Sequence, residues 1–239
     1  MNEGELWLIT GSSKGLGKCL VDGLADSDNA IVHGYSRGNM SGPKNYHHHK
    51  ADLSDKTSLL NIEFPDLPEN CNKVVLINNA ASLGEIAYVG SQKNEEIIRT
   101  YVLNVIAPHI LINKCVQQYQ DVAISIINIS SGAATSPYDG WNLYCSSKAA
   151  IQMLTEVIHK ESEISNLDVK VHAIAPGVLD TEMQAQIRAA DTNSFSRKEK
   201  FEQLHQNGDL KDPNLAAGLI IDIAREIKLI DSIIYRLPL

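Results

Sequence analysis

The sequence contains only four cysteines, no run of clustered cations, and no apolar stretch long enough to cross a bilayer. Cys19, Cys71, Cys115 and Cys145 show no paired spacing, which favours buried thiols in a reducing compartment over disulfide bonds or a zinc site. Residues 1–5 lack the basic segment and apolar core of a signal peptide. We therefore expect a cytoplasmic protein that is neither exported nor inserted in a membrane.

The chain is acidic, with a formal net charge of −8. Binding to a phosphate backbone needs clustered cations, so we exclude a general nucleic-acid binder. Three consecutive histidines, His47–His49, resemble a metal-binding tract, but consecutive strand residues point to alternate faces and rarely converge on one ion. We assign them no function and expect no metal. No repeat, low-complexity tract or linker interrupts the sequence, so we expect one domain over residues 1–239.

Apolar runs alternate with helical stretches, which predicts an α/β fold: a doubly wound parallel sheet of about seven strands with helices on both faces. The predicted strands are Leu6–Thr10, Ala30–Ser36, His48–Ala51, Lys73–Asn78, Ala123–Ile129, Lys170–Ala175 and Ser232–Tyr235. The predicted helices are Gly15–Ala25, a short one after Ser54, Asn94–Tyr119, Tyr144–Glu163 and Pro213–Glu226.

A polar, loosely helical segment, Asp180–Asp212, breaks this alternation. Ligands of open parallel sheets bind beyond the carboxyl ends of the strands, where this segment is placed to cover a substrate as a lid. For its far part, Asn193–Gln206, a solvated helix pair without a gating role is an equal alternative.

A glycine-rich turn, Thr10–Gly17, follows the apolar run Leu6–Ile9 and precedes a helical pattern. This strand, turn and helix context is the one that a dinucleotide-binding fingerprint requires. Glycines there let the backbone approach a pyrophosphate at the helix N-terminus. Taken alone, the turn could equally be a tight connection with no ligand.

Tyr144 and Lys148 lie four residues apart in a predicted helix and therefore share one face. The Lys148 charge can then favour the ionised form of the Tyr144 phenol. We expect this pair to form a proton donor that works near neutral pH.

Further residues stand at fixed intervals from this pair. They are Ser131, thirteen residues before Tyr144, Asn104, forty residues before it, and Asn78-Asn79-Ala80. With the glycine-rich turn, Asp52-Leu53, and Pro176-Gly177 followed by Thr181, they give the chain a resemblance to the classical short-chain dehydrogenase/reductases. The resemblance covers nearly the whole chain, and it departs from the family pattern at Ala81, where the family usually has Gly.

The resemblance implies a Rossmann fold and a role for each catalytic candidate. Tyr144 would give the proton to the carbonyl oxygen and Ser131 would polarise it. Lys148 would depress the phenol pKa and hold the nicotinamide ribose, while Asn104 would kink its helix and hold a water. Taken singly, Asn104 and the serines could be ordinary polar residues, but the joint spacing favours the catalytic reading, and the offset favours Ser131 over Ser130.

The second strand ends in Tyr35-Ser36-Arg37, where an NAD enzyme would usually place a carboxylate. Arg37 and Lys14 could instead bind a 2′-phosphate, with Ser36 donating a hydrogen bond, so we predict NADPH. A solvated Arg37, and an enzyme that oxidises alcohols with NAD, remain alternatives. The expected cofactor-binding residues are Gly11, Ser13, Lys14, Gly15, Leu16, Gly17, Ser36, Arg37, Asp52, Leu53, Asn79, Ala80, Asn104, Tyr144, Lys148, Pro176, Gly177, Val178 and Thr181.

The segments before Tyr144 and after Pro176 resemble the sepiapterin reductase and bacterial benzil reductase branch. Tyr138, Trp141, Leu179 and Met183, with Ser131 and Tyr144, would line a pocket for a small diketone or an aromatic ketone. Core packing is the alternative for Trp141, and an N-cap for Thr181. A pterin reductase and a catalytically silent NADP-binding sensor remain other functions. By analogy with the family we expect a homodimer or homotetramer.

Overall fold

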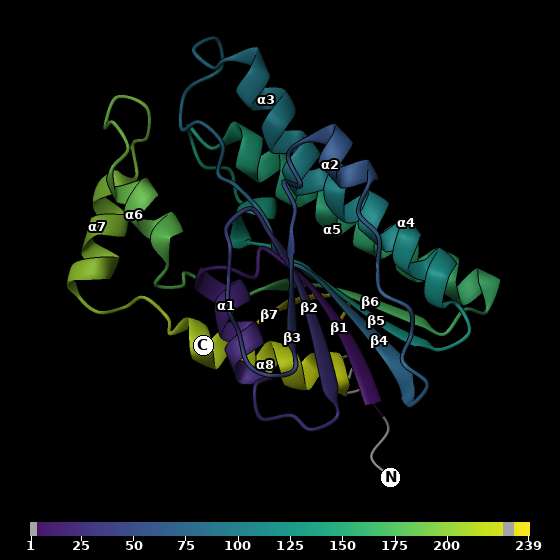
Figure 1. The fold of residues 1–239 in the computed structure, drawn as a ribbon. Coiled ribbons are helices and arrows are strands. Elements are labelled where there is room, and N and C mark those ends of the chain that lie inside the picture. The colour runs from purple at the N-terminus through teal and green to yellow at the C-terminus, as the bar shows by residue number, and fades with distance from the viewer. Residues whose placement is uncertain (1–3, 227–231) are drawn as a thin grey trace.

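The computed structural model describes residues 4–226 and 232–239, and a seven-stranded sheet forms its centre. All neighbouring strands are parallel, in the order β3-β2-β1-β4-β5-β6-β7, so the winding reverses between β1 and β4 (Figure 1). The predicted doubly wound sheet is therefore confirmed. The strands are β1 Gly4–Thr10, β2 Ala30–Ser36, β3 Tyr46–Lys50, β4 Cys71–Asn78, β5 Ala123–Ile129, β6 Val169–Ala175 and β7 Ile234–Arg236.

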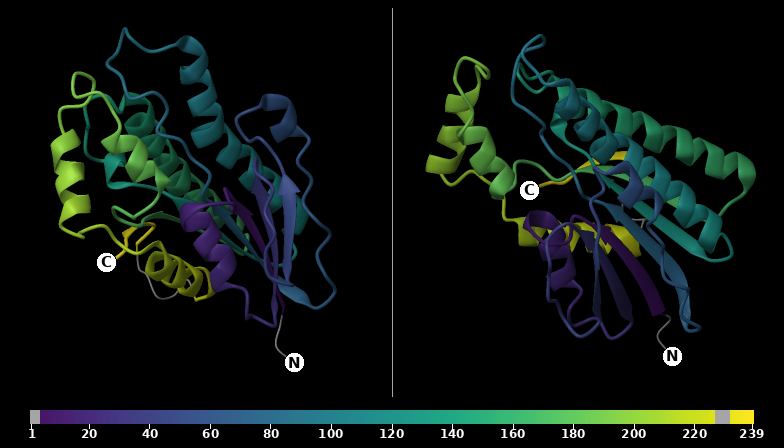
Figure 2. Two further views of the ribbon diagram at one scale, coloured as in Figure 1. Left: turned by 60° about the vertical axis from the view of Figure 1, so that its left-hand side comes forward. Right: turned by 45° about the horizontal axis from the view of Figure 1, so that its top comes forward.

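Helices cover both faces of the sheet, with α1 and α8 on one side and α4 and α5 on the other (Figures 1 and 2). The helices are α1 Gly15–Gly23, α2 Lys56–Leu60, α3 Asn94–Tyr101, α4 Ala107–Tyr119, α5 Asn142–Ser165, α6 Glu182–Arg188, α7 Lys198–Gln206 and α8 Pro213–Arg225. A π-helical segment, η1 Val102–Ile106, joins α3 to α4, and a short 3₁₀ turn, η2 Gly132–Ala134, follows β5.

Strand β1 shows why this sequence folds as three layers. Trp7 and Ile9 pack among residues of α1 and α8, whereas Leu6 and Leu8 pack among residues of α4 on the opposite face. Successive strand residues point to opposite faces, and a parallel sheet covered on both sides buries both sets. All four side chains are completely buried, which explains the continuous apolar run in the sequence.

The predicted strand boundaries agree with the structure at β2 and β5 and differ by one or two residues elsewhere. The expected strand Ser232–Tyr235 is displaced toward the C-terminus, because β7 pairs only through Ile234–Arg236 with Ala173–Ala175. The catalytic-candidate helix begins at Asn142 rather than Tyr144. It ends at Ser165, followed by Asn166 in the left-handed conformation (φ 56°) that commonly closes a helix.

The segment between β6 and α8 forms α6 and α7, which stand beside the sheet at the end where the loops lie (Figure 2). Most of its far part is exposed or half-buried, but Phe195 and Phe201 are buried against Trp141. Whether this segment opens and closes as a lid stays a prediction.

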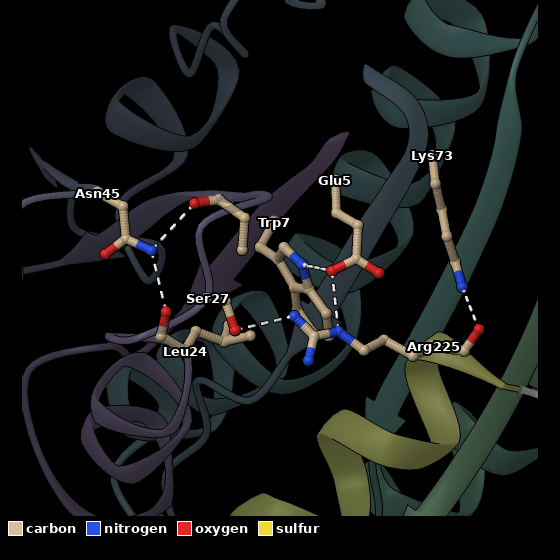
Figure 3. Close-up of polar contacts among 8 residues, drawn as sticks. Glu5, Trp7, Leu24, Ser27, Asn45, Lys73 and Arg225 are labelled. Atoms are coloured by element: carbon tan, nitrogen blue, oxygen red, sulfur yellow. Dashed lines mark hydrogen bonds and ion pairs between the residues drawn. The ribbon is translucent and has the colours of Figure 1, made fainter. Parts of the chain in front are cut away.

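A polar network ties the C-terminal end of α8 to the amino ends of β1 and β4 (Figure 3). The Arg225 Nε donates to Glu5 Oε2 at 2.9 Å, and its Nη2 donates to Ser27 Oγ at 3.0 Å. The Trp7 indole N–H donates to the same Glu5 oxygen at 3.0 Å, while Lys73 Nζ donates to the Arg225 carbonyl at 2.5 Å. Arg225 and Glu5 neutralise each other in a half-buried site. Removing either side chain would therefore leave the other charge uncompensated.

The histidine tract lies on β3 at the edge of the sheet. His49 stacks on His33 and Tyr35, with 2.8 Å between His33 Nδ1 and His49 Nε2. Burial lowers the pKa of His33 to about 4. Over residues 4–226 and 232–239, no group of three or more His, Cys, Asp or Glu is placed to hold a metal ion.

All four cysteines are free thiols, of which Cys71 and Cys115 are buried and the other two are half-buried. None of the helices in the described ranges has the length and apolar character needed to span a membrane.

Candidate active site

A cavity of about 770 Å³ opens at the carboxyl ends of the strands. Its wall includes most of the residues that the sequence predicted for cofactor and substrate, from Gly11 after β1 to Thr181 after β6. Gly17 and Asn104 are the two predicted site residues that do not line it. The sequence therefore brings together residues that lie far apart along the chain, as expected where the winding of a parallel sheet reverses.

Glycines in the glycine-rich turn stand where the backbone is crowded or has a positive φ. A Cβ at Gly17 would lie 2.1 Å from the Gly11 carbonyl oxygen, so this position supports close packing of α1 on the turn rather than contact with a ligand. Gly11 has φ +67°, a conformation that L-residues with side chains rarely adopt. A glycine-rich turn ahead of a helix N-terminus fits a pyrophosphate.

The turn is fixed by the strand beside it. Thr10 Oγ1 accepts hydrogen bonds from the backbone N–H groups of Asn79 and Ala80, at 3.0 and 3.1 Å. The Asn79 amide donates to the carbonyls of Thr10 and Gly11, at 3.0 and 3.2 Å. Asn78 instead donates to Asn128 inside the sheet. Asn79 and Ala80 thus shape the cavity, whereas Asn78 supports the sheet.

The cations predicted to bind a 2′-phosphate are placed differently from one another. Arg37 is exposed at the cavity wall directly after β2, as expected. Lys14 Nζ lies 2.5 Å from Glu182 Oε2 on α6, and both side chains are largely exposed. We predicted no acid opposite these two cations, but Glu182 pairs with Lys14 and the charge of Arg37 acts on Asp52.

Asp52 also lines this end of the cavity. Burial acts to raise the pKa of Asp52, but hydrogen bonds from Ser54 and the charges of Arg37 and Arg99 together lower it. Ser54 donates both its backbone N–H and its hydroxyl to Asp52 Oδ1, at 2.9 and 2.6 Å. The carboxylate is therefore held within its own turn.

Tyr144, Lys148 and Ser131 converge on one wall of the cavity. The Ser131 Oγ accepts from the Ala133 N–H at 3.1 Å, whereas the Ser130 Oγ accepts from the Gln152 Nε2 of α5 at 3.1 Å. Lys148 Nζ donates to the Ile129 carbonyl at 2.6 Å and lies 5.6 Å from the centroid of the Tyr144 ring.

The acid–base properties of the pair differ from the sequence prediction. Burial raises the pKa of Tyr144 to about 12, against a smaller lowering by the Ser131 hydrogen bond, and burial lowers the pKa of Lys148 to about 8. The phenol is thus not acidified, because burial disfavours its ionised form. It is fully protonated at neutral pH, which is the form that donates a proton.

Asn104 occupies the centre of the π-helical segment. Its Oδ1 accepts from the Ser82 N–H at 2.9 Å, and its Nδ2 donates to the Ser82 carbonyl and to Ser147 Oγ, at 2.8 and 3.0 Å. The side chain therefore ties the helix to the strand-end loop and to α5 beside Lys148. The helix is distorted at Asn104, as expected. That Asn104 holds a water stays a prediction.

The predicted substrate residues form an aromatic wall next to Tyr144. The Trp141 ring stacks on Tyr138 and Phe195, with centroids 4.9 and 5.1 Å apart, and meets Tyr144 edge-on at 5.9 Å. Trp141 lines the cavity and is also part of a buried cluster, so both alternatives for it hold. Leu179 and Met183 line the cavity from the α6 side.

Thr181 occupies the N-cap position of α6 without a side-chain capping bond. It lines the cavity, as do Pro176, Gly177 and Val178. Ala81 also lines it and has no positive φ, so an alanine fits where the family usually has glycine.

Asp139 fastens the α6–α7 connection to the loop that precedes the catalytic-candidate helix. Its carboxylate accepts hydrogen bonds from the Ser196 N–H at 2.7 Å, the Ser196 hydroxyl at 2.9 Å and the Tyr88 hydroxyl at 3.1 Å. Gly140 adopts φ +74°, and a Cβ there would lie 2.1 Å from the Ser194 carbonyl oxygen. The two segments are thus packed directly against each other through their backbones.

Several residues that line the cavity were not predicted. Leu83 and Phe201 come from segments in which no site residue was predicted, and Arg236 is the last residue of β7. Gln184 adjoins the predicted Met183 and shares a buried helix face with Ile187, three residues later. That spacing is the one signal that could have identified it.

Comparisons with known proteins agree with this geometry. A family model described as short chain dehydrogenase matches residues 5–192. The chain is 34% identical over 231 residues to a benzil reductase ((S)-benzoin forming) of Bacillus subtilis, covering 92% of this chain and 93% of that protein. It is 32% identical over 187 residues to the sepiapterin reductase of Bos taurus, covering 74% and 68%.

A solved short chain dehydrogenases/reductase structure from Saccharomyces cerevisiae superposes with a TM-score of 0.83 at 22% identity, covering 98% of this chain and 96% of that one. That likeness shows the shared fold. Together with the extent of the family match, it leads to one conclusion. The chain belongs to the short-chain dehydrogenase family, and is an oxidoreductase that acts on carbonyl or CH–OH groups with a nicotinamide cofactor.

Proposed function

We propose that the protein is an NADPH-dependent carbonyl reductase that reduces small diketones or aromatic ketones. One observation carries this proposal: Tyr144, Ser131 and Lys148 meet in a cavity that also contains the glycine-rich turn and the aromatic wall. Sequence identities of 34% and 32% to two benzil reductases, over 92% and 89% of this chain, support diketones or aromatic ketones as substrates.

The protein groups would act on the carbonyl oxygen. The bound nicotinamide supplies a hydride to the carbonyl carbon, so negative charge develops on the oxygen. Ser131 and Tyr144 would donate hydrogen bonds to that oxygen, and Tyr144 would transfer its proton. Lys148, whose pKa is lowered by burial to about 8, would stabilise the phenolate that remains and help to return a proton to it.

The choice of NADPH rests on Arg37. The exposed guanidinium of Arg37 lies at the cavity wall directly after β2. An NAD enzyme usually has a carboxylate at this position. A guanidinium binds a phosphate through two parallel hydrogen bonds. Lys14 would add to this site only by leaving Glu182, so we assign it the smaller share.

The proposal is tested by mixing the protein with NADPH and benzil and following the absorbance of the reduced coenzyme. We expect oxidation of NADPH with formation of benzoin. If the protein binds NADPH but gives no turnover with a broad panel of diketones, aryl ketones and sepiapterin, a sensor role replaces the enzymatic one. Turnover of sepiapterin alone would favour a pterin reductase.

We also propose a homo-oligomer that forms through the α4 and α5 side. Ile106, Met153 and Val157 expose between 43% and 60% of their side chains there. Met153→Asp with Val157→Asp should lower the particle mass measured by light scattering, whereas Leu215→Asp on α8 should not. A wild-type monomer would contradict the proposal.

We further propose a cytoplasmic location. The free thiols support it, and cell fractionation would test it.

A further inference from the structure

The glycine-rich turn has a buried side chain at its middle that does not reach the cavity. Gly11 and Ser13 line the cavity, whereas Ser12 between them is completely buried and does not line it. The Ser12 Oγ lies 3.0 Å from the Tyr46 Oη, so the two hydroxyls are hydrogen-bonded. Tyr46 is the first residue of β3 and is itself buried. A residue more than thirty positions along the chain therefore contacts the middle of the turn.

This hydrogen bond spans the width of a strand. β2 lies between β1, which leads into the turn, and β3, which contains Tyr46. The bond can form because β2 has a glycine in its interior: a Cβ at Gly34 would lie 2.3 Å from the Tyr46 Oη and 2.5 Å from the Ser12 Oγ. A glycine inside a strand weakens the strand and often marks a close approach of other groups. Gly34 therefore leaves the space that the Ser12–Tyr46 hydrogen bond needs.

Side chains fix the glycine-rich turn from two sides. On the side of β4, Thr10 Oγ1 accepts from backbone N–H groups after that strand, and the Asn79 amide donates to carbonyls of the turn. On the side of β3, the turn is fixed by the Ser12–Tyr46 hydrogen bond. The Tyr46 Oη also lies 3.1 Å from the His48 Nδ1, so Tyr46 can donate to one neighbour and accept from the other.

We propose that Tyr46 and Ser12 are positioning residues for coenzyme binding, because their hydrogen bond holds the glycine-rich turn in the shape that receives the pyrophosphate. This inference rests on the proposed function, in which the turn binds the coenzyme. A turn that already has its binding conformation costs less to order when the ligand arrives. Without the hydrogen bond a smaller fraction of the free protein has a competent turn, and the apparent dissociation constant rises by the same factor.

The test is Tyr46→Phe, which removes the hydroxyl and keeps the ring. We expect the dissociation constants of NADPH and NADH, measured by fluorescence titration, each to rise about 3- to 10-fold, the net contribution of one hydrogen bond. Their ratio should stay at the wild-type value, because both coenzymes contain the pyrophosphate. In the protein without coenzyme, the amide hydrogens of residues 11–17 should exchange faster with deuterium. Ser12→Ala should give the same changes, and the double variant should bind no more weakly than either single one.

The matched control is Tyr119→Phe. The Tyr119 hydroxyl donates to the Pro65 carbonyl at 2.5 Å, and Tyr119 is buried but does not line the cavity. This variant should lower the unfolding midpoint, as Tyr46→Phe does, and change neither dissociation constant. Unchanged constants in Tyr46→Phe and Ser12→Ala, an equal rise in Tyr119→Phe, or additive losses in the double variant would each overturn the inference. A wild-type protein that binds neither coenzyme overturns the proposed function itself, so the two failures are distinguishable.

Discussion

Tyr144→Phe should lower kcat for the reduction of benzil by about 10²- to 10⁴-fold, the usual contribution of a positioned general acid. The phenol is buried and burial raises its pKa, so it is protonated at neutral pH, and its loss removes the proton donor without creating a large cavity. The NADPH dissociation constant should stay nearly unchanged. Stopped-flow measurement of NADPH oxidation and a binding titration check both values.

A matched control is Tyr101→Phe. The Tyr101 hydroxyl bonds Ser146 Oγ at 2.8 Å on the outer side of α5, and Tyr101 does not line the cavity. This variant should retain wild-type kcat. If Tyr144→Phe retained most of the activity, another group would have to supply the proton.

Arg37→Asp should reverse the coenzyme preference, changing the ratio of the NADPH and NADH dissociation constants by about 10²- to 10³-fold. The change removes charge-assisted hydrogen bonds worth about 1.5–3 kcal/mol and brings a carboxylate that repels a 2′-phosphate. The same carboxylate can accept from the ribose 2′-hydroxyl of NADH. Fluorescence titration with each coenzyme measures both constants.

Lys18→Asp is the control for net charge, because Lys18 pairs with Asp22 on α1 and lies outside the cavity wall. It should leave the ratio within about threefold of the wild-type value, since an exposed charge at a distance is screened by salt. Equal affinity of the wild-type protein for NADPH and NADH would remove the argument from Arg37.

Local pattern was enough to predict the elements that are buried on both faces. Strands β2 and β5 were placed to the residue because their apolar runs end at turn residues or at the catalytic-candidate serines. The predicted bounds of the short β7 were wrong because its extent depends on which residues of β6 it pairs with. The residues of β7 alone do not determine that pairing.

The errors at the site have the same origin. Lys14 and Glu182 are 168 residues apart in the chain, so no local pattern shows that they meet. The helical spacing of Tyr144 and Lys148 was right, but their burial was unknown, and burial decides the direction of both pKa shifts. Phe195 and Phe201 lie in a polar stretch, which hid their contact with Trp141.

The contact between Asp139-Gly140 and the Ser194–Ser196 loop has a consequence for changing what this enzyme accepts. Asp139-Gly140 leads directly into α5, the helix of the proposed proton donor. The Ser194–Ser196 loop contains Phe195, which stacks on Trp141. A mutation that reshapes either one is transmitted to its partner, so single replacements should often trade turnover for altered selectivity. Libraries that randomise residues 138–141 and 194–201 jointly should therefore yield active variants with new preferences more often than libraries confined to one segment.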